Sequence, residues 1–95
     1  QYDKMNFNKH RHLLSYLMAD LEKSSLDAES INRLRFFLEK AEYEIFLDYV
    51  LDLVYERQIP ISIEFYSILE TWSPLVDIDL KYVVPLKELI RPTPH

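Results

Sequence analysis

The chain has 95 residues, a formal net charge of −5, and neither glycine nor cysteine. That length fits one small domain, and a hydrophobic content of 48% is typical of a globular chain. The missing glycines exclude the phosphate-binding loops of nucleotide enzymes, and the missing cysteines exclude disulfides and zinc–thiolate sites.

The first predicted helix runs from about Asn6 to Lys23, with Asn6 or Asn8 as its cap. Its apolar residues recur at three- and four-residue spacing, which is the period of a helix with one buried face. They are Leu14, Leu17, Met18 and Leu21.

The second predicted helix begins near Asp27, its N-cap, with Glu29 in the first turn, where a negative charge suits the helix dipole. Its buried stripe is expected at Ile31, Leu34, Leu38 and Ala41. Because glycine is absent, we expect asparagine, serine or lysine where helix ends usually close on glycine.

The third predicted helix covers roughly residues 40–58 and is either separate from the second or continuous with it through a kink. Apolar side chains cover more than half of its circumference, which is typical of a helix packed by neighbours on several sides. We therefore expect it to be the central helix of the domain. Its apolar residues are Tyr43, Phe46, Leu47, Val50, Leu51, Leu53 and Val54.

Pro60 ends the third helix, and Ser62 is the predicted N-cap of a fourth, which Pro74 ends or kinks. Two alternatives remain beyond Pro74: a fifth helix kinked at Pro85, which we favour, or an extended segment over residues 82–84. The stripe of the fourth helix is expected at Phe65, Ile68, Leu69 and Trp72. Together these elements predict one all-α domain of four or five helices over residues 1–95, with loose ends at about 1–5 and 91–95.

Charge is unevenly distributed along the chain. Residues 1–40 hold seven of the eleven basic residues, whereas residues 41–80 hold one base, Arg57, against nine acids. Four-residue spacing on a helix places side chains in one slowly drifting row, and like charges at that spacing repel by about 0.2–0.5 kcal/mol per pair. The third helix carries such a row, called the acid row below: Glu44, Asp48, Asp52 and Glu56.

Nothing in the sequence predicts catalysis, so we expect no catalytic residue, no metal and no cofactor. A carboxylate metal site in a bundle needs inward Glu-x-x-His motifs, and a calcium loop needs glycine. A nucleophile elbow needs glycine as well. Paired carboxylates work as acid and base only in a cleft that separates their pKa values, which a convex helix surface does not provide.

The acid row has two interpretations. One is an ordinary solvated face, since Asp and Glu are generally exposed. The other is a docking surface for a basic protein, because complementary charge speeds association and tyrosine is enriched at binding hot spots. The second predicts as contacts the acid row itself, with Tyr49 and Tyr55 as anchors and Glu42 and Glu64 at the rim.

Membranes and nucleic acids are not expected as partners. No apolar run reaches the roughly 18–20 residues that a membrane span needs, and no signal-peptide pattern opens the chain. A charge of −5 repels phosphate backbones. The absence of cysteine is compatible with a reducing cytoplasm. Because the chain starts at Gln1 and its first methionine is Met5, whether it holds the native N-terminus stays open.

The segment from Asp27 to Val76 resembles small bacterial immunity proteins of the MafI and contact-dependent growth inhibition type. The matching stretches are Glu42-Tyr43-Glu44-Ile45, Leu47-Asp48-Tyr49-Val50-Leu51, and Tyr55-Glu56-Arg57-Gln58-Ile59-Pro60-Ile61-Ser62, followed by a helix that bears Tyr66. The family usually has glycine before the glutamate, where this chain has Lys40 or Ala41, and a small residue where it has Phe46.

The resemblance implies a cytoplasmic, mostly helical protein that binds and neutralises one cognate secreted toxin domain. Such toxins are often RNases, including ones of the EndoU type. A nuclease active site is basic because it must hold phosphates, so an acidic protein can cover that cleft and block access. The alternative is a non-enzymatic helical adaptor or regulatory interaction module with no toxin partner.

Overall fold

The structure of the protein, a computed structural model, describes residues 4–92, with side chains from residue 11 onward. Within that range the chain forms four α-helices and three short 3₁₀ helices, and the predicted all-α class is confirmed. The elements are α1 (Lys4–Glu22), α2 (Ala28–Glu39), α3 (Tyr43–Arg57), α4 (Ile63–Trp72), η1 (Ser73–Val76), η2 (Leu80–Tyr82) and η3 (Val84–Leu89).

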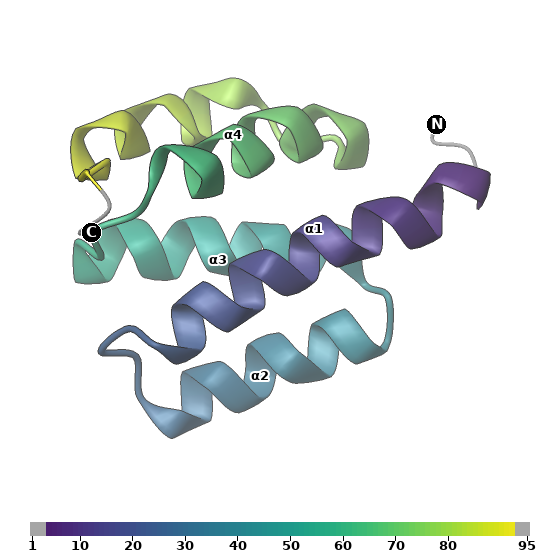
Figure 1. Ribbon diagram of the computed structural model, residues 1–95, viewed down its shortest axis with the longest axis horizontal. Coiled ribbons are helices and arrows are strands. Elements are labelled where there is room, and N and C mark those ends of the chain that lie inside the picture. The colour runs from purple at the N-terminus through teal and green to yellow at the C-terminus, as the bar shows by residue number, and fades with distance from the viewer. Residues whose placement is uncertain (1–3, 93–95) are drawn as a thin grey trace.

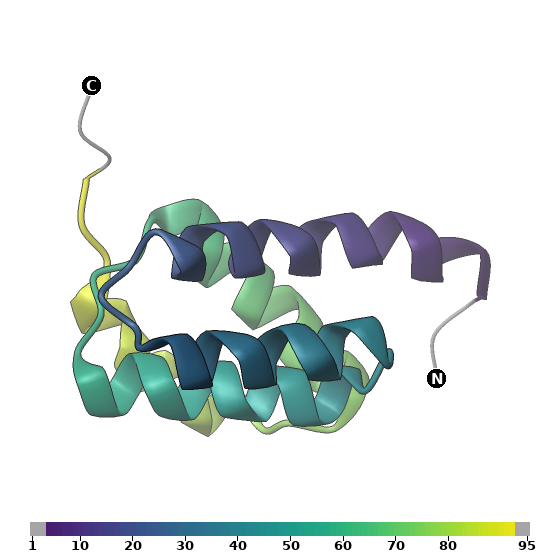
Figure 2. The ribbon, with the colours of Figure 1, turned by 90° about the horizontal axis from the view of Figure 1, so that it is seen from below.

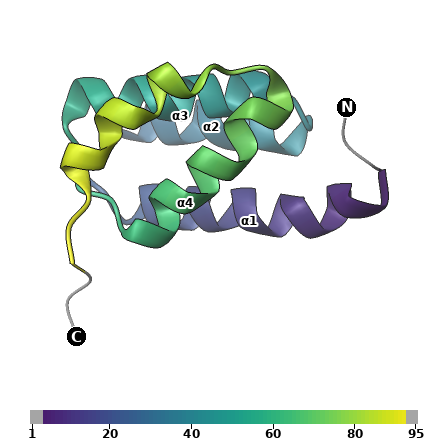
Figure 3. The same ribbon diagram turned by 90° about the horizontal axis from the view of Figure 1, so that it is seen from above.

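Helix α3 lies in the middle of the bundle (Figure 1). It contacts α2 on one side and η1 and η3 on the other, while α1 contacts α2 and α4 (Figures 1 and 2). After α4 the chain turns back, and its 3₁₀ helices run beside α3 (Figure 3). The predicted central position of the third helix is therefore confirmed.

The core is built mainly from the predicted apolar stripes, although Ile31 and Ile68 are only half-buried. Trp72 of α4 is fully buried, and its ring meets that of Tyr43 edge-on, with the ring centroids 5.9 Å apart. Burying rings of this size removes a large apolar area from water, which favours folding. Every predicted core residue of α1 and α3 is buried: Leu14, Leu17, Met18, Leu21, Tyr43, Phe46, Leu47, Val50, Leu51, Leu53 and Val54.

Two of the predicted helix caps are confirmed. Asp27 precedes α2 and accepts a hydrogen bond from the Ser30 N–H at 3.1 Å. Ser62 precedes α4 and accepts one from the Phe65 N–H at 3.0 Å. Each bond satisfies a backbone donor that the first helical turn leaves without a partner inside the helix.

The predicted start of the first helix is wrong. Helix α1 is already formed at Lys4, so Asn6 and Asn8 lie within it and do not cap it. The loose end expected at about residues 1–5 stays a prediction: Lys4 and Met5 belong to α1, and residues 1–3 lie outside the described residues. Extending a helix adds one hydrogen bond for each residue fixed, so a formed helix continues past a residue that could have capped it.

Helices α2 and α3 are separate and antiparallel, which excludes the kinked continuous helix (Figure 1). The chain reverses at Ala41, whose φ is 57°. There the Ala41 N–H donates to the Leu38 carbonyl at 3.1 Å and the Glu42 N–H to the Phe37 carbonyl at 2.9 Å, the pattern of a Schellman motif. Ala41 is exposed, so its predicted place in the buried stripe of the second helix is wrong.

The same left-handed conformation recurs at Gln58 after α3 and at Asp77 after η1. The expected cap residues occur at two helices, where Lys40 closes α2 and Ser73 closes α4, whereas Gln58 closes α3. Alanine, glutamine and aspartate occupy the three left-handed positions. A residue with a Cβ atom pays roughly 1–2 kcal/mol in this region of φ/ψ space. Each reversal keeps its two backbone hydrogen bonds, which hold the strained residue in place.

The C-terminal part is neither a kinked α-helix nor an extended segment over residues 82–84. It forms η2 and η3, with Pro85 in the first turn of η3. Proline lacks an N–H and its ring clashes with the preceding turn of an α-helix, so the chain adopts short 3₁₀ turns here. Asp79 caps η2 by accepting a hydrogen bond from the Lys81 N–H at 2.9 Å.

One parallel bridge attaches this segment to the linker between α3 and α4. The Ile61 N–H donates to the Leu89 carbonyl at 3.0 Å, and the Arg91 N–H donates to the Ile61 carbonyl at 2.8 Å. The loose end expected at about residues 91–95 stays a prediction: Arg91 makes this main-chain bond, and residues 93–95 lie outside the described residues.

Candidate functional site

The acid row lies on the exposed arc of α3, as its spacing predicts. Its four carboxylates, Glu44, Asp48, Asp52 and Glu56, are all exposed. Three ion pairs form among residues 11–92, and none includes a member of the row. Arg57, the one base within residues 41–80, pairs instead with Asp27 at the start of α2, with Nη1 3.3 Å from Oδ1. The row is thus left without a neutralising partner in the described part of the chain.

Repulsion within the row is visible at Asp52. Partial burial raises the pKa of this carboxyl above its usual value, and the negative charges of Asp48 and Glu56 raise it further. All three effects disfavour the charged form of Asp52. A cation placed beside the row would relieve the repulsion.

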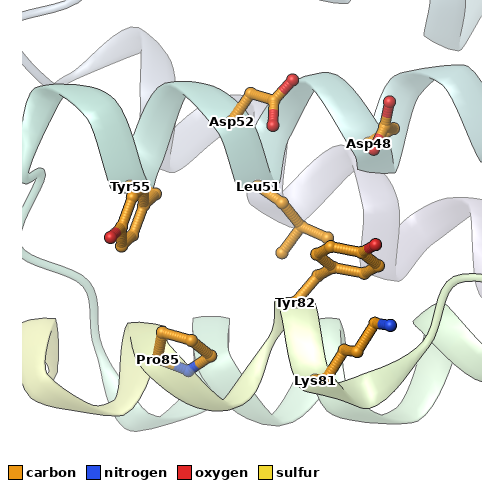
Figure 4. Close-up of a pocket in the computed structure, with 7 residues that line it drawn as sticks. All are labelled: Asp48, Leu51, Asp52, Tyr55, Lys81, Tyr82 and Pro85. Carbon is orange, nitrogen blue, oxygen red and sulfur yellow. The ribbon is translucent and has the colours of Figure 1, made fainter.

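A groove separates the acid row from the 3₁₀ segment. It consists of two hollows of about 430 and 440 Å³ that share Asp48, Lys81 and Tyr82, and we call it the α3–η2 groove. The first hollow lies toward the end of α3 and is lined by Asp48, Leu51, Asp52, Tyr55, Lys81, Tyr82 and Pro85 (Figure 4). The second lies toward its start and is lined by Glu44, Ile45, Asp48, Asp77, Ile78, Asp79, Lys81 and Tyr82.

Two tyrosines form opposite sides of the first hollow. Tyr55 projects from α3 and Tyr82 from η2, and the side chain of Leu51 lies between them (Figure 4). Leu51 is buried, whereas Tyr55 and Tyr82 are 57% and 60% exposed. The groove therefore combines an apolar floor with two accessible aromatic rings, and large exposed rings of this kind are typical of binding surfaces.

The charge of the groove is strongly negative. Among the described residues that line it, five carboxylates face one ammonium group, that of Lys81. The Lys81 Nζ lies 5.2 Å from the centroid of the Tyr82 ring, within the range of a cation–π interaction.

The structure brings only part of the predicted site together. Glu44, Asp48, Asp52 and Tyr55 line the groove, and Glu56 extends the row beyond it.

The remaining predicted contacts lie elsewhere. Tyr49 is half-buried on the α2 side of α3, where its ring meets that of Phe37 edge-on at 6.2 Å between centroids. Glu42 is the N-cap residue of α3 and its side chain makes no capping hydrogen bond. Glu64 belongs to α4 and faces α1: the pKa of Asp20 there is raised chiefly by burial, with a smaller upward contribution from Glu64.

Sequence reasoning missed Ile45 of α3 and every groove residue after η1, which are Asp77, Ile78, Asp79, Lys81, Tyr82 and Pro85. The side chains after η1 follow no helical or strand period, so nothing in the pattern places them beside α3. The usable signal is compositional, because the two aspartates and a tyrosine after Pro74 repeat the chemistry of the acid row.

Among the described residues, no three His, Cys, Asp or Glu side chains come together in a way that could hold a metal ion. No helix found there is both long and apolar enough to cross a membrane. Comparisons of this chain with protein-family models, curated proteins and solved structures found no match.

Proposed function

We propose that this protein is an immunity protein, which binds a basic toxin domain through the acid row and the α3–η2 groove and thereby neutralises it. The observation that carries this proposal is a row of four carboxylates without ion-pair partners among residues 11–92, beside a groove with two exposed tyrosines. Such a surface is complementary to a positively charged partner, since close charge pairs and aromatic anchors contribute much of the binding energy at interfaces.

The proposed partner is a secreted nuclease, with an RNase of the EndoU type as the specific candidate from the family resemblance. Phosphate-binding clefts are lined with Lys and Arg. At 1.5 Å rise per residue, the acid row from Glu44 to Glu56 is about 18 Å long, and one strand of nucleic acid carries a phosphate roughly every 3.4 Å. The row is thus long enough to occupy several phosphate positions at once. Inhibition follows from covering the cleft and needs no chemistry by the inhibitor.

A helical adaptor is the second candidate, and exposed apolar side chains away from the groove favour it. Phe36 of α2 and Ile63 of α4 are 52% and 53% exposed. An adaptor holds two partners at the same time and so needs a second binding surface. The gene beside this one separates the two candidates, because an immunity gene lies next to the gene of its toxin.

The test is capture of the partner from the native organism, with identification by mass spectrometry, followed by binding kinetics with a charge-reversed variant. Asp48→Lys with Asp52→Lys should slow association about tenfold or more at low salt, because charge steering changes on-rates by about 10–10³-fold. Glu39→Lys with Glu70→Lys makes the same charge change at two exposed positions that do not line the groove, and should leave binding nearly unchanged. Normal binding and protection by the Asp48/Asp52 variant would make the row an ordinary solvated face.

A further inference from the structure

We propose that the α3–η2 groove seats an arginine side chain of the partner, with the guanidinium between the rings of Tyr55 and Tyr82 and against the carboxylates of Asp48 and Asp52. This inference rests on the proposed function and deepens it by naming the chemical group that the groove recognises. It predicts that the groove binds an arginine-bearing basic segment more tightly than other positively charged surfaces.

The two tyrosine rings stand beside one shared space. Tyr55 and Tyr82 come from elements far apart in the sequence and stand on opposite sides of one hollow (Figure 4). Both keep more than half of their surface in solvent. The faces of aromatic rings carry negative charge and attract cations, so two rings beside one space form a seat for a flat cation.

One of these rings already has a cation beside it. The ammonium of Lys81 lies over Tyr82, 5.2 Å from the ring centroid. Among residues 11–92, Lys81 forms no ion pair with the carboxylates around it. The ring of Tyr82 is therefore accessible to a positive charge in this fold, and Lys81 is an internal competitor for the position.

Arginine suits the first hollow better than an apolar side chain or lysine does. An apolar side chain would take water away from carboxylates without pairing them, which is unfavourable. A lysine ammonium is compact and heavily hydrated, and meets one ring at most as a point charge. The guanidinium of arginine is planar, stacks on aromatic faces and has five donors in a fork that fits carboxylates, so it alone uses both rings and both aspartates. A hollow of about 430 Å³ has room for it with part of its backbone.

The experiment is an NMR titration of the full chain at low salt with two hexapeptides, one of alternating glycine and arginine and one of alternating glycine and lysine. The arginine peptide should bind about three- to tenfold more tightly, as two exposed cation–π contacts allow. The largest amide shifts should fall at Leu51, Tyr55 and Tyr82.

Ring variants test the seat itself. Tyr55→Leu and Tyr82→Leu should each weaken the arginine peptide about threefold and reduce its advantage over the lysine peptide, and the double variant should remove that advantage. Tyr55→Phe keeps the ring and should keep the preference, which controls for any change in folding. Tyr16→Leu alters a 41%-exposed tyrosine on α1 that does not line the groove, and should change neither peptide.

Charge variants separate this inference from the proposed function. Asp48→Asn with Asp52→Asn should weaken both peptides to a similar extent, and Lys81→Gln should strengthen the arginine peptide about twofold by removing the competing cation. Equal binding of the two peptides, unaffected by the ring variants, would overturn the arginine seat and leave a basic partner in place. If neither peptide binds the unmodified chain, the arginine seat is overturned, while partner capture and association kinetics decide the proposed function separately.

Discussion

Two neighbouring helices of this small bundle treat their carboxylates in opposite ways. Both arginines of α2 form ion pairs: Arg33 pairs with Glu29 at 3.4 Å, and Arg35 pairs with Glu22 of α1. On α3, no carboxylate of the acid row has a partner of this kind among residues 11–92.

The chain has enough basic residues to pair with the acid row, but the ion pairs among residues 11–92 lie elsewhere. The chain has eleven Lys and Arg residues, and Arg57 stands directly after Glu56, yet its guanidinium reaches Asp27 on the other helix. Partners at four-residue spacing would stabilise α3, whereas the row destabilises it. Unpaired carboxylates also occur elsewhere in the described part of the chain, as at Glu39 and Glu70, but on α3 four of them follow one another in a row beside the groove.

The largest expected effect comes from reversing charge on both faces. Arg33→Glu with Arg35→Glu removes two pairs and creates repulsion with Glu29 and Glu22, so it should lower the free energy of unfolding by about 1–2 kcal/mol. Asp48→Lys with Asp52→Lys should leave that free energy unchanged or raise it by up to about 1 kcal/mol. Urea unfolding of both variants measures this, and shifts of the same sign would contradict the contrast.

Asp27, which pairs with Arg57, should make a contribution to folding stability that depends on pH. Hydrogen bonds from the Ser30 hydroxyl and the Ser30 N–H, with a smaller contribution from Arg57, lower the pKa of Asp27 from 3.8 to about 2. A lowered folded-state pKa gives stability that is present above pH 3.8 and lost as the pH falls toward about 2.

Asp27→Asn keeps a good capping residue but removes the charge. Unfolding of this variant and the unmodified chain, compared from pH 7 to pH 2, should show a difference that is constant near neutrality and disappears at the acid end. A difference that is the same at every pH would mean that the charge of Asp27 contributes nothing.

The turn between the paired helix and the acid row gives an effect of similar or smaller size. Ala41 has a φ of 57°, which glycine adopts without strain. Ala41→Gly should therefore raise the free energy of unfolding by about 1 kcal/mol, whereas Ala19→Gly, inside α1, should lower it by about 0.5–1 kcal/mol. Thermal unfolding of the two variants measures this, and destabilisation by both would show that Ala41 is not strained.

The smallest effect is expected from relieving the row at one position. Asp52→Asn removes two like-charge contacts, with Asp48 and Glu56, and should raise the free energy of unfolding near pH 7 by roughly 0.5 kcal/mol. Because the folded-state pKa of Asp52 is raised, its ionisation opposes folding, and the gain should shrink as the pH falls to 3.8 and below. Chemical unfolding at pH 7 and pH 3 tests this, and a gain that grows on acidification would be the wrong sign.

The parts that could be predicted from sequence depend on local pattern. Periodicity gives the buried stripes of α1 and α3, side-chain chemistry gives the caps at Asp27 and Ser62, and spacing gives the exposure of the acid row. Each of these follows from residues within one or two helical turns of one another.

The parts that could not be predicted depend on packing between distant segments. Tyr49 and Tyr55 stand at opposite edges of the exposed arc of α3, and the sequence does not say which edge meets α2 and which meets the groove. Glu64 has the same charge as the row but belongs to a helix that faces α1. Tyr82 reaches the groove through 3₁₀ turns that have no recognisable sequence period.

The bridge between Ile61 and Ile90 helps to hold one side of the groove in place. One side is the central helix, while the other is a run of 3₁₀ turns attached by main-chain bonds at Ile61 and by the buried side chains of Val83, Leu86 and Leu89. These attachments hold Lys81 and Tyr82 beside the acid row. Loss of the attachments would open the groove and leave the acid row on α3. Under the proposed arginine seat, a bound guanidinium would bridge the two sides of the groove and oppose that opening.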